Sequence, residues 1–132
     1  MYTVKEVSQM LDMSSHTIRY YTNLGLVPTL QRDENNNRRI FNDKSIGWLR
    51  AIQHLRNGGM SVQAVKEYFE LCLVGDSTVP QRYRIIMEQK AMIEKKLKEI
   101  EACAAFLNHK AEYYTQLMTG EISDDTSNPD KW

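Results

Sequence analysis

The chain has 132 residues, 42% of them hydrophobic and 26% charged, and its 17 basic and 17 acidic side chains give a net charge of zero. This composition is typical of one globular domain with an appendage and excludes a fibrous or largely disordered chain. The sequence contains no apolar run of about 18 residues and no secretory leader, so we expect no membrane association and a cytoplasmic location. The charge is uneven, because residues 1–60 carry eight Lys or Arg against five Asp or Glu, and residues 61–132 carry nine against twelve.

The first 25 residues predict two short helices joined by a tight turn. Thr3 and Glu6 have the spacing of a capping box, and apolar residues at helical spacing continue to Leu11. The following turn ends in two serines, and we expect the second of them to precede a helix over 16–24 that Gly25 ends. This arrangement is a helix-turn-helix, in which the second helix binds in the major groove of DNA.

A short two-stranded hairpin is expected next. Pro28 excludes further helix, and the segments 29–32 and 39–41 flank the run Asp-Glu-Asn-Asn-Asn-Arg, which is rich in turn-forming residues. Asparagine tolerates the left-handed backbone that a tight hairpin tip needs. The sequence therefore predicts a wing beside the helix-turn-helix.

Two more helices are expected after the hairpin. Asn42 or Asp43 can cap the first, which ends at the glycine pair that starts with Gly58. Ser61 can cap the second, and Gly75 ends it. We therefore expect a helix pair to complete an N-terminal domain over residues 1–75.

A single long helix is expected over residues 80–118, because neither glycine nor a further proline interrupts the chain before Gly120. Its length is about 58 Å at 1.5 Å per residue. Apolar residues recur at alternating spacings of four and three, which is a heptad seam with Lys90 as one polar position. Because an exposed apolar seam is unfavourable in water, a second helix should cover it and the chain should form a homodimer. The residues expected to pair are Ile86, Ile93, Leu97, Ile100, Ala104, Leu107 and Tyr114.

The predicted organisation is mainly α-helical and has three parts. A winged helix-turn-helix DNA-binding domain with its helix pair spans 1–75, and a coiled-coil dimerisation helix spans 76–119. The remaining residues, 120–132, form a polar tail that we expect to be flexible.

Several motifs occur in order along the first half of the chain: Ile18-Arg19-Tyr20-Tyr21, Gly25-Leu26, Pro28, Arg32 and Arg39-x-Phe41. Together they resemble the MerR family of bacterial transcription regulators. The chain differs from the family pattern at the wing tip, where Asn37-Arg38 replaces the usual Gly-Tyr.

The resemblance implies a long helix that dimerises as an antiparallel coiled coil. It also implies a repressor or activator that binds a palindromic promoter operator, with double-stranded DNA and RNA polymerase as partners. Such a regulator acts by distorting promoter DNA whose two recognition elements are spaced too far apart, which is a form of indirect readout.

The expected DNA contacts lie at the start of the second helix and on the wing. Side chains at the start of a recognition helix face base edges, and wing arginines bind phosphate or enter the minor groove. The alternative for the wing is a solvated charged hairpin. The expected contacts are Ser15, His16, Thr17, Arg19 and Tyr20 on the helix, and Arg38 and Arg39 on the wing.

The two cysteines predict neither a metal site nor a disulfide, since Cys72 and Cys103 are far apart and have no metal-ligand spacing. Cys72 is the candidate thiol sensor, but its place on an apolar stripe favours a packing role. We expect Cys103 to pack in the dimer interface. Aromatic side chains of the last two helices can line a pocket for a small effector, although core and dimer packing accounts for them better. No cofactor is expected.

Two other classes of function are alternatives to a regulator. No nucleophile, metal or phosphate-loop motif of an enzyme is present, and the three histidines are scattered, so we expect no enzymatic activity. The stronger alternative is an excisionase-like architectural or adaptor protein that binds DNA without a sensing role. A regulator should protect a palindromic site, and an adaptor should not.

Overall fold

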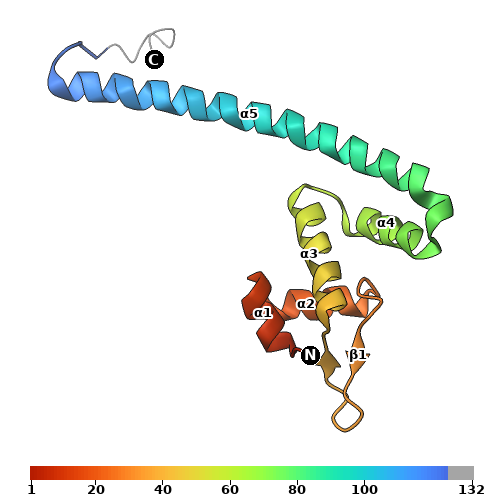
Figure 1. The fold of residues 1–132 in the computed structure, drawn as a ribbon. Helices are drawn as coiled ribbons and strands as arrows, with labels where there is room; N and C mark the ends of the chain where they lie inside the picture. Colours follow the sequence, from red (N-terminus) through yellow and green to blue (C-terminus); the bar gives the residue numbers. More distant parts are fainter. Residues whose placement is uncertain (125–132) are drawn as a thin grey trace. The chain divides into compact units, whose positions relative to one another are not determined.

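The computed structural model describes residues 1–124 and divides into two compact units, Met1–Met87 and a second that begins at Glu88. The expected mainly α-helical fold is confirmed, with a winged helix-turn-helix followed by a long helix (Figure 1). The tail predicted over 120–132 lies largely outside the described residues. The elements in chain order are α1 (Val4–Leu11), α2 (Ser15–Asn23), β1 (Gln31–Arg32), β2 (Arg39–Ile40), α3 (Asp43–Asn57), α4 (Val62–Val74), the 3₁₀ helix η1 (Asp76–Thr78) and α5 (Val79–Thr119).

Three of the four predicted N-cap residues cap their helices, and the cap of α2 lies one residue earlier than predicted. Thr3 forms the full capping box of α1, and the side chains of Asn42 and Ser61 cap α3 and α4. Ser14, not Ser15, caps α2, because Ser14 has the extended backbone that turns its hydroxyl towards the first-turn amides. The helix therefore starts one residue earlier than expected.

The core of the first unit lies among its four helices. A side chain of α3 satisfies a backbone carbonyl at the C-terminal end of α1, since Gln53 Nε2 donates a 2.7 Å hydrogen bond to the carbonyl oxygen of Leu11. Trp48 of α3 contacts Phe69 of α4 edge to face, with ring centroids 4.7 Å apart. The buried residues are Val7, Leu11, Ile18, Tyr21, Leu26, Val27, Phe41, Ile46, Leu49, Ile52, Met60, Val65 and Phe69.

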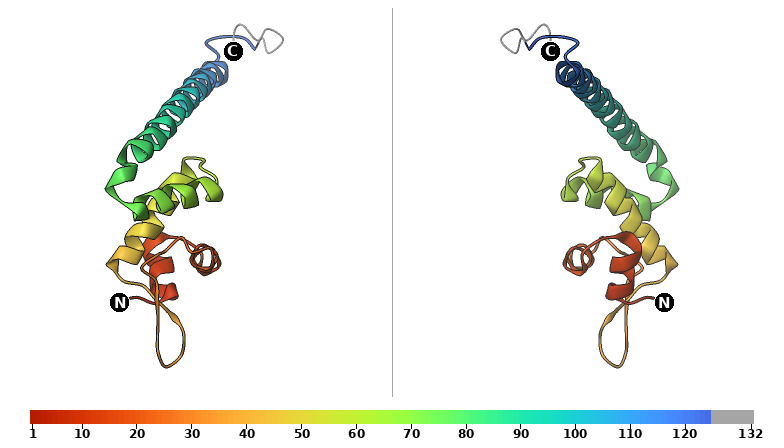
Figure 2. Two further views of the ribbon diagram at one scale, coloured as in Figure 1. Left: turned by 90° about the vertical axis from the view of Figure 1, so that its right-hand side faces the viewer. Right: turned by 90° about the vertical axis from the view of Figure 1, so that its left-hand side faces the viewer.

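The N-terminal residues are joined to the wing, which projects from the helices as a narrow hairpin (Figure 2). The amide of Tyr2 donates to the carbonyl of Phe41 at 2.7 Å, and the amide of Phe41 donates back at 2.8 Å. Because Phe41 follows β2 directly, these two bonds fix the start of α1 beside the wing. The strands themselves are shorter than predicted and pair over two residues each.

The junction between α4 and α5 contains a 3₁₀ turn that the sequence did not predict. The hydroxyl of Thr78 lies 2.6 Å from the carbonyl oxygen of Leu71 and 2.8 Å from that of Gly75. Arg82 donates from Nε to Thr78 Oγ1 and from Nη2 to the Gly75 carbonyl, at 3.0 and 3.2 Å. A cation at the end of α4 satisfies its last carbonyls and interacts favourably with the helix dipole.

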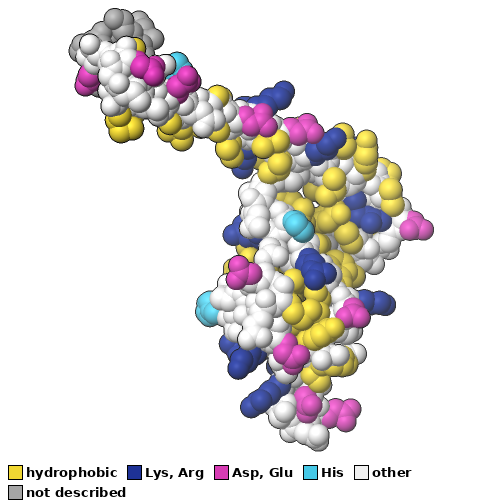
Figure 3. Space-filling view, turned by 60° about the vertical axis from the view of Figure 1, so that its left-hand side comes forward, with side chains coloured by type: hydrophobic (Ala, Val, Ile, Leu, Met, Phe, Trp, Pro, Cys, Tyr) yellow, Lys and Arg dark blue, Asp and Glu magenta, His cyan; other side chains and the backbone are white. Residues whose placement is uncertain are grey.

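The second unit consists mainly of the later turns of α5. Over its 41 residues α5 has one buried side chain, Tyr113. The predicted seam is open to solvent, as shown by Leu97 at 54% exposure and Ile100 at 65%, and hydrophobic side chains recur along the helix in Figure 3. No helix within residues 1–124 is long and apolar enough to span a membrane.

Candidate nucleic-acid interface

The first turns of α2 present a polar outer face and an apolar inner one. Ile18 and Tyr21 point into the core and are 0% and 8% exposed. His16 and Arg19 are exposed on the outer face, and Tyr20 is about half exposed. The outer side chains are therefore free to meet a ligand while the inner ones fix the helix.

The two smaller predicted residues on this helix are less accessible. Ser15 and Thr17 are half-buried. The Thr17 hydroxyl accepts a 2.7 Å hydrogen bond from Ser14 Oγ, which is part of the α2 cap. Thr17 thus helps to start the helix, and this structural role was missed in the sequence.

Arg39 joins the wing to the end of α2. Its Nε donates to Thr22 Oγ1 at 2.9 Å and its Nη2 donates to Asn23 Oδ1 at 2.7 Å. Burial, followed by repulsion from Arg32 and Arg19, lowers the pKa of Arg39 below its ordinary value. The guanidinium of the half-buried Arg39 is therefore held by neutral acceptors, within electrostatic range of two other arginines.

The other wing arginine has a different setting. Arg38 is exposed, and its backbone amide donates to Asn36 Oδ1 at 3.0 Å. The side chain of Arg32, on the opposite strand, donates to the Asn37 carbonyl at 3.1 Å. The structure thus separates a positioning arginine, Arg39, from one whose side chain extends to solvent, Arg38.

The wing tip is a compact hydrogen-bonded turn. Asp33 Oδ1 accepts from the amides of Asn35 and Asn36, at 2.8 and 3.1 Å. Asn37 has the expected left-handed backbone, with φ at 57°. The organising role of Asp33 was not predicted, although an aspartate in a turn commonly accepts from the amide two residues further on, which forms an Asx turn.

A cavity of about 600 Å³ lies where α1, α2 and the wing meet. Four of its seven lining residues are basic, and none is acidic. Lys5 was not among the predicted contacts, because only the Tyr2–Phe41 pairing brings the first turn of α1 to the wing. The lining residues are Thr3, Val4, Lys5, Arg19, Asn37, Arg38 and Arg39.

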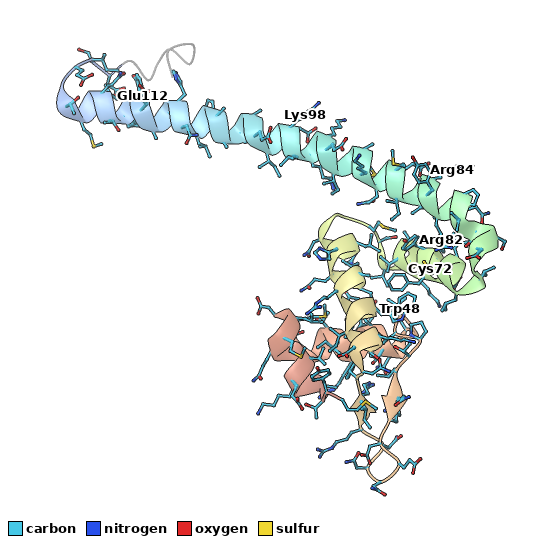
Figure 4. The ribbon with its side chains drawn as sticks, in the orientation of Figure 1. Trp48, Cys72, Arg82, Arg84, Lys98 and Glu112 are labelled. Carbon is cyan, nitrogen blue, oxygen red and sulfur yellow. The ribbon has the colours of Figure 1, made fainter. Side chains whose placement is uncertain are left out.

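The candidate thiol sensor lies away from this cavity. Cys72 on α4 is half-buried, so it is more accessible than Val65 and Phe69 on the same stripe. Burial, and next the neighbouring Cys72, raises the pKa of Tyr68, and Arg82 opposes the shift. Cys72 lies in the last turn of α4 and Arg82 in the first turn of α5, and both are labelled in Figure 4.

The other cysteine and the metal-binding residue types form no site within residues 1–124. Cys103 is exposed on α5. No group of three His, Cys, Asp or Glu side chains in this part of the chain lies close enough together to hold a metal ion.

Comparison with known proteins places this geometry in a family. The model of the MerR HTH family of regulatory proteins matches residues 2–72, which contain both helices of the helix-turn-helix, the wing, α3 and most of α4. The chain belongs to the MerR HTH family. An uncharacterized HTH-type transcriptional regulator of Haemophilus influenzae is 33% identical over 113 residues, covering 86% of this chain and 83% of the relative. The regulator AdhR of Bacillus subtilis is 31% identical over 87 residues, which are 66% of this chain and 61% of AdhR.

Solved MerR structures share the fold over most of the chain. The crystal structure of HiNmlR, a MerR family regulator lacking the sensor domain and bound to promoter DNA, superposes with a TM-score of 0.83 at 31% identity and covers 89% of each chain. A MerR family regulator from Bacillus thuringiensis superposes with a TM-score of 0.76 at 33% identity, covering 86% of this chain and 98% of the other. The likeness therefore extends beyond the helix-turn-helix into α5.

Proposed function

We propose that this MerR-family chain is a transcription regulator that binds a palindromic promoter operator as a homodimer. The observation that carries the proposal is the exposed Arg19 on the outer face of α2, next to the arginines of the wing. A recognition helix with an exposed arginine can donate two hydrogen bonds to a guanine edge in the major groove. The similarity of residues 2–72 to MerR regulators, one of which was solved bound to promoter DNA, supports DNA binding by the outer face of α2.

The predicted residues divide by role. His16 and Arg19 have the exposure needed for base contacts, and Tyr20 and Arg38 have the exposure needed for phosphate. Ser15 can contribute its hydroxyl at the helix start. Arg39 and Thr17 act mainly by holding the wing and the start of α2 in place.

The homodimer is supported by the open seam of α5. Ile93, Leu97 and Leu107 are 37%, 54% and 62% exposed in the single chain, although each belongs to the heptad pattern of a coiled coil. Burial of a large apolar side chain contributes about 1.5 to 3 kcal/mol, so several such residues favour a second copy strongly. Two DNA-binding units joined in this way match a two-fold symmetric site.

Regulation follows from how such a dimer changes promoter DNA. A wing and a recognition helix in each subunit can offset a bending cost of a few kcal/mol, and this makes DNA distortion the means of action. RNA polymerase at the same promoter then responds to the altered DNA.

The experiment starts by selecting bound duplexes from a random pool. A palindromic consensus is expected, with footprints on two half-sites. Arg19→Ala should weaken binding to the selected duplex by about 1 to 3 kcal/mol and relax the preference at one base pair per half-site. Arg84→Ala, on an exposed arginine of α5, is the matched control and should bind like the parent. A consensus without two-fold symmetry, or unchanged affinity in Arg19→Ala, contradicts the proposal.

A further inference from the structure

We propose that Lys5 on α1, Arg19 on α2 and Arg38 on the wing together bind one backbone phosphate of the DNA. The proposal rests on the DNA-binding function above and adds α1 to the interface. These side chains come from three separate elements and line one cavity of about 600 Å³. An anion such as a phosphate is the ligand expected for a cavity lined by several cations.

The charge of the cavity is not neutralised by the protein. Its lining contains four cations and no carboxylate, and within residues 1–124 no ion pair joins Lys5, Arg19 or Arg38 to an acidic side chain. Repulsion from Arg19 is one cause of the lowered pKa of Arg39, which shows that these charges affect one another. An anion in the cavity would relieve this repulsion.

The walls of the cavity are fixed in the folded chain. The two hydrogen bonds between Tyr2 and Phe41 hold the start of α1 beside the wing. The bonds from Arg39 to Thr22 and Asn23 hold the wing against α2. These links do not use the side chains of Lys5, Arg19 or Arg38, so the three cations remain available to an anion.

A DNA phosphate suits the site better than a free anion does. Arg19 lines the cavity and also lies on the outer face of α2, and its guanidinium has five N–H donors, so one can donate to the phosphate while two others donate to a guanine edge. A phosphate bound there therefore belongs to the same duplex whose bases face that helix. Phosphate contacts of this kind fix the register of a recognition helix without sequence preference. Lys5 would thus set how deeply α2 enters the groove.

The test measures the salt dependence of DNA binding for Lys5→Gln in the full chain. Two probes are used, the selected operator duplex and a 30-base-pair duplex of random sequence. Lys5→Gln should weaken binding to both by similar factors and reduce the slope of log K against log salt by about one for each bound subunit. Lys95→Gln removes the same charge from an exposed site on α5 and should leave the slope unchanged.

The possible outcomes separate the two proposals. The phosphate site is wrong if the parent binds duplexes but Lys5→Gln keeps the parental slope of log K against log salt. It is also wrong if Lys95→Gln reduces that slope as much as Lys5→Gln does. In both cases the proposed regulator function is unaffected. If the parent binds no duplex, the proposed function itself fails. Inorganic phosphate at constant ionic strength should compete only weakly, and strong competition that is lost in Lys5→Gln would identify a free-anion site instead. Lys5 is exposed, so the thermal unfolding of the variant should match that of the parent.

Discussion

The first unit and the later part of α5 differ in how their apolar residues are used. In the first unit, thirteen hydrophobic side chains from α1 to α4 and the segments between them form a closed core. In α5, only Tyr113 is buried, while Leu97, Ile100 and Leu107 are more than half exposed. Apolar side chains are therefore covered by the same chain in the first unit, whereas in α5 they remain exposed to solvent in the single chain and fit the second copy proposed above.

The largest effect should come from a charge placed on the α5 seam. Leu97→Asp puts a carboxylate where the coiled coil would be dry, and burial of an unpaired charge costs several kcal/mol. The variant should be monomeric by light scattering at low micromolar concentration and should lose operator binding. Lys95→Asp places the same carboxylate on the same helix but off the seam, and it should remain dimeric. A dimeric Leu97→Asp would mean that the seam was assigned wrongly.

A smaller but still large effect is expected in the closed core. Leu49 on α3 is 0% exposed, and Leu49→Ala should lower the free energy of unfolding by about 2 to 5 kcal/mol because it leaves a cavity. Leu73 on α4 is 60% exposed, and the same substitution there should change stability by less than about 0.5 kcal/mol. Urea unfolding followed by circular dichroism measures both, at one protein concentration. Similar losses at the two positions would remove the distinction between core and surface in the first unit.

The elements of the fold could be predicted from local signals. Thr3 with Glu6, the glycines at 25 and 75, and the uninterrupted chain before Gly120 each act within one or two helical turns, so the sequence alone indicates them. The errors are also local: Ser14 and Ser15 are both acceptable caps, and only the backbone conformation distinguishes them. The 3₁₀ turn at Asp76–Thr78 was missed although Thr78 and Arg82, which donate to the carbonyl of Gly75, lie within two helical turns of it.

The candidate site was harder to predict because it depends on contacts between distant residues. The positioning role of Arg39 requires Thr22 and Asn23, sixteen and more residues away along the chain. The place of Lys5 in the cavity requires the pairing of Tyr2 with Phe41. The sequence therefore identified the arginines as candidates, and the tertiary structure was needed to assign separate roles to them.

We propose above that two copies joined through α5 present their first units to one duplex. Light scattering of the unmodified chain, coupled to size-exclusion chromatography, measures this assembly directly. We expect a mass of twice the chain mass of 15.4 kDa without DNA, and two chains per operator duplex in the complex. A single-chain mass in both conditions would contradict the proposed dimer.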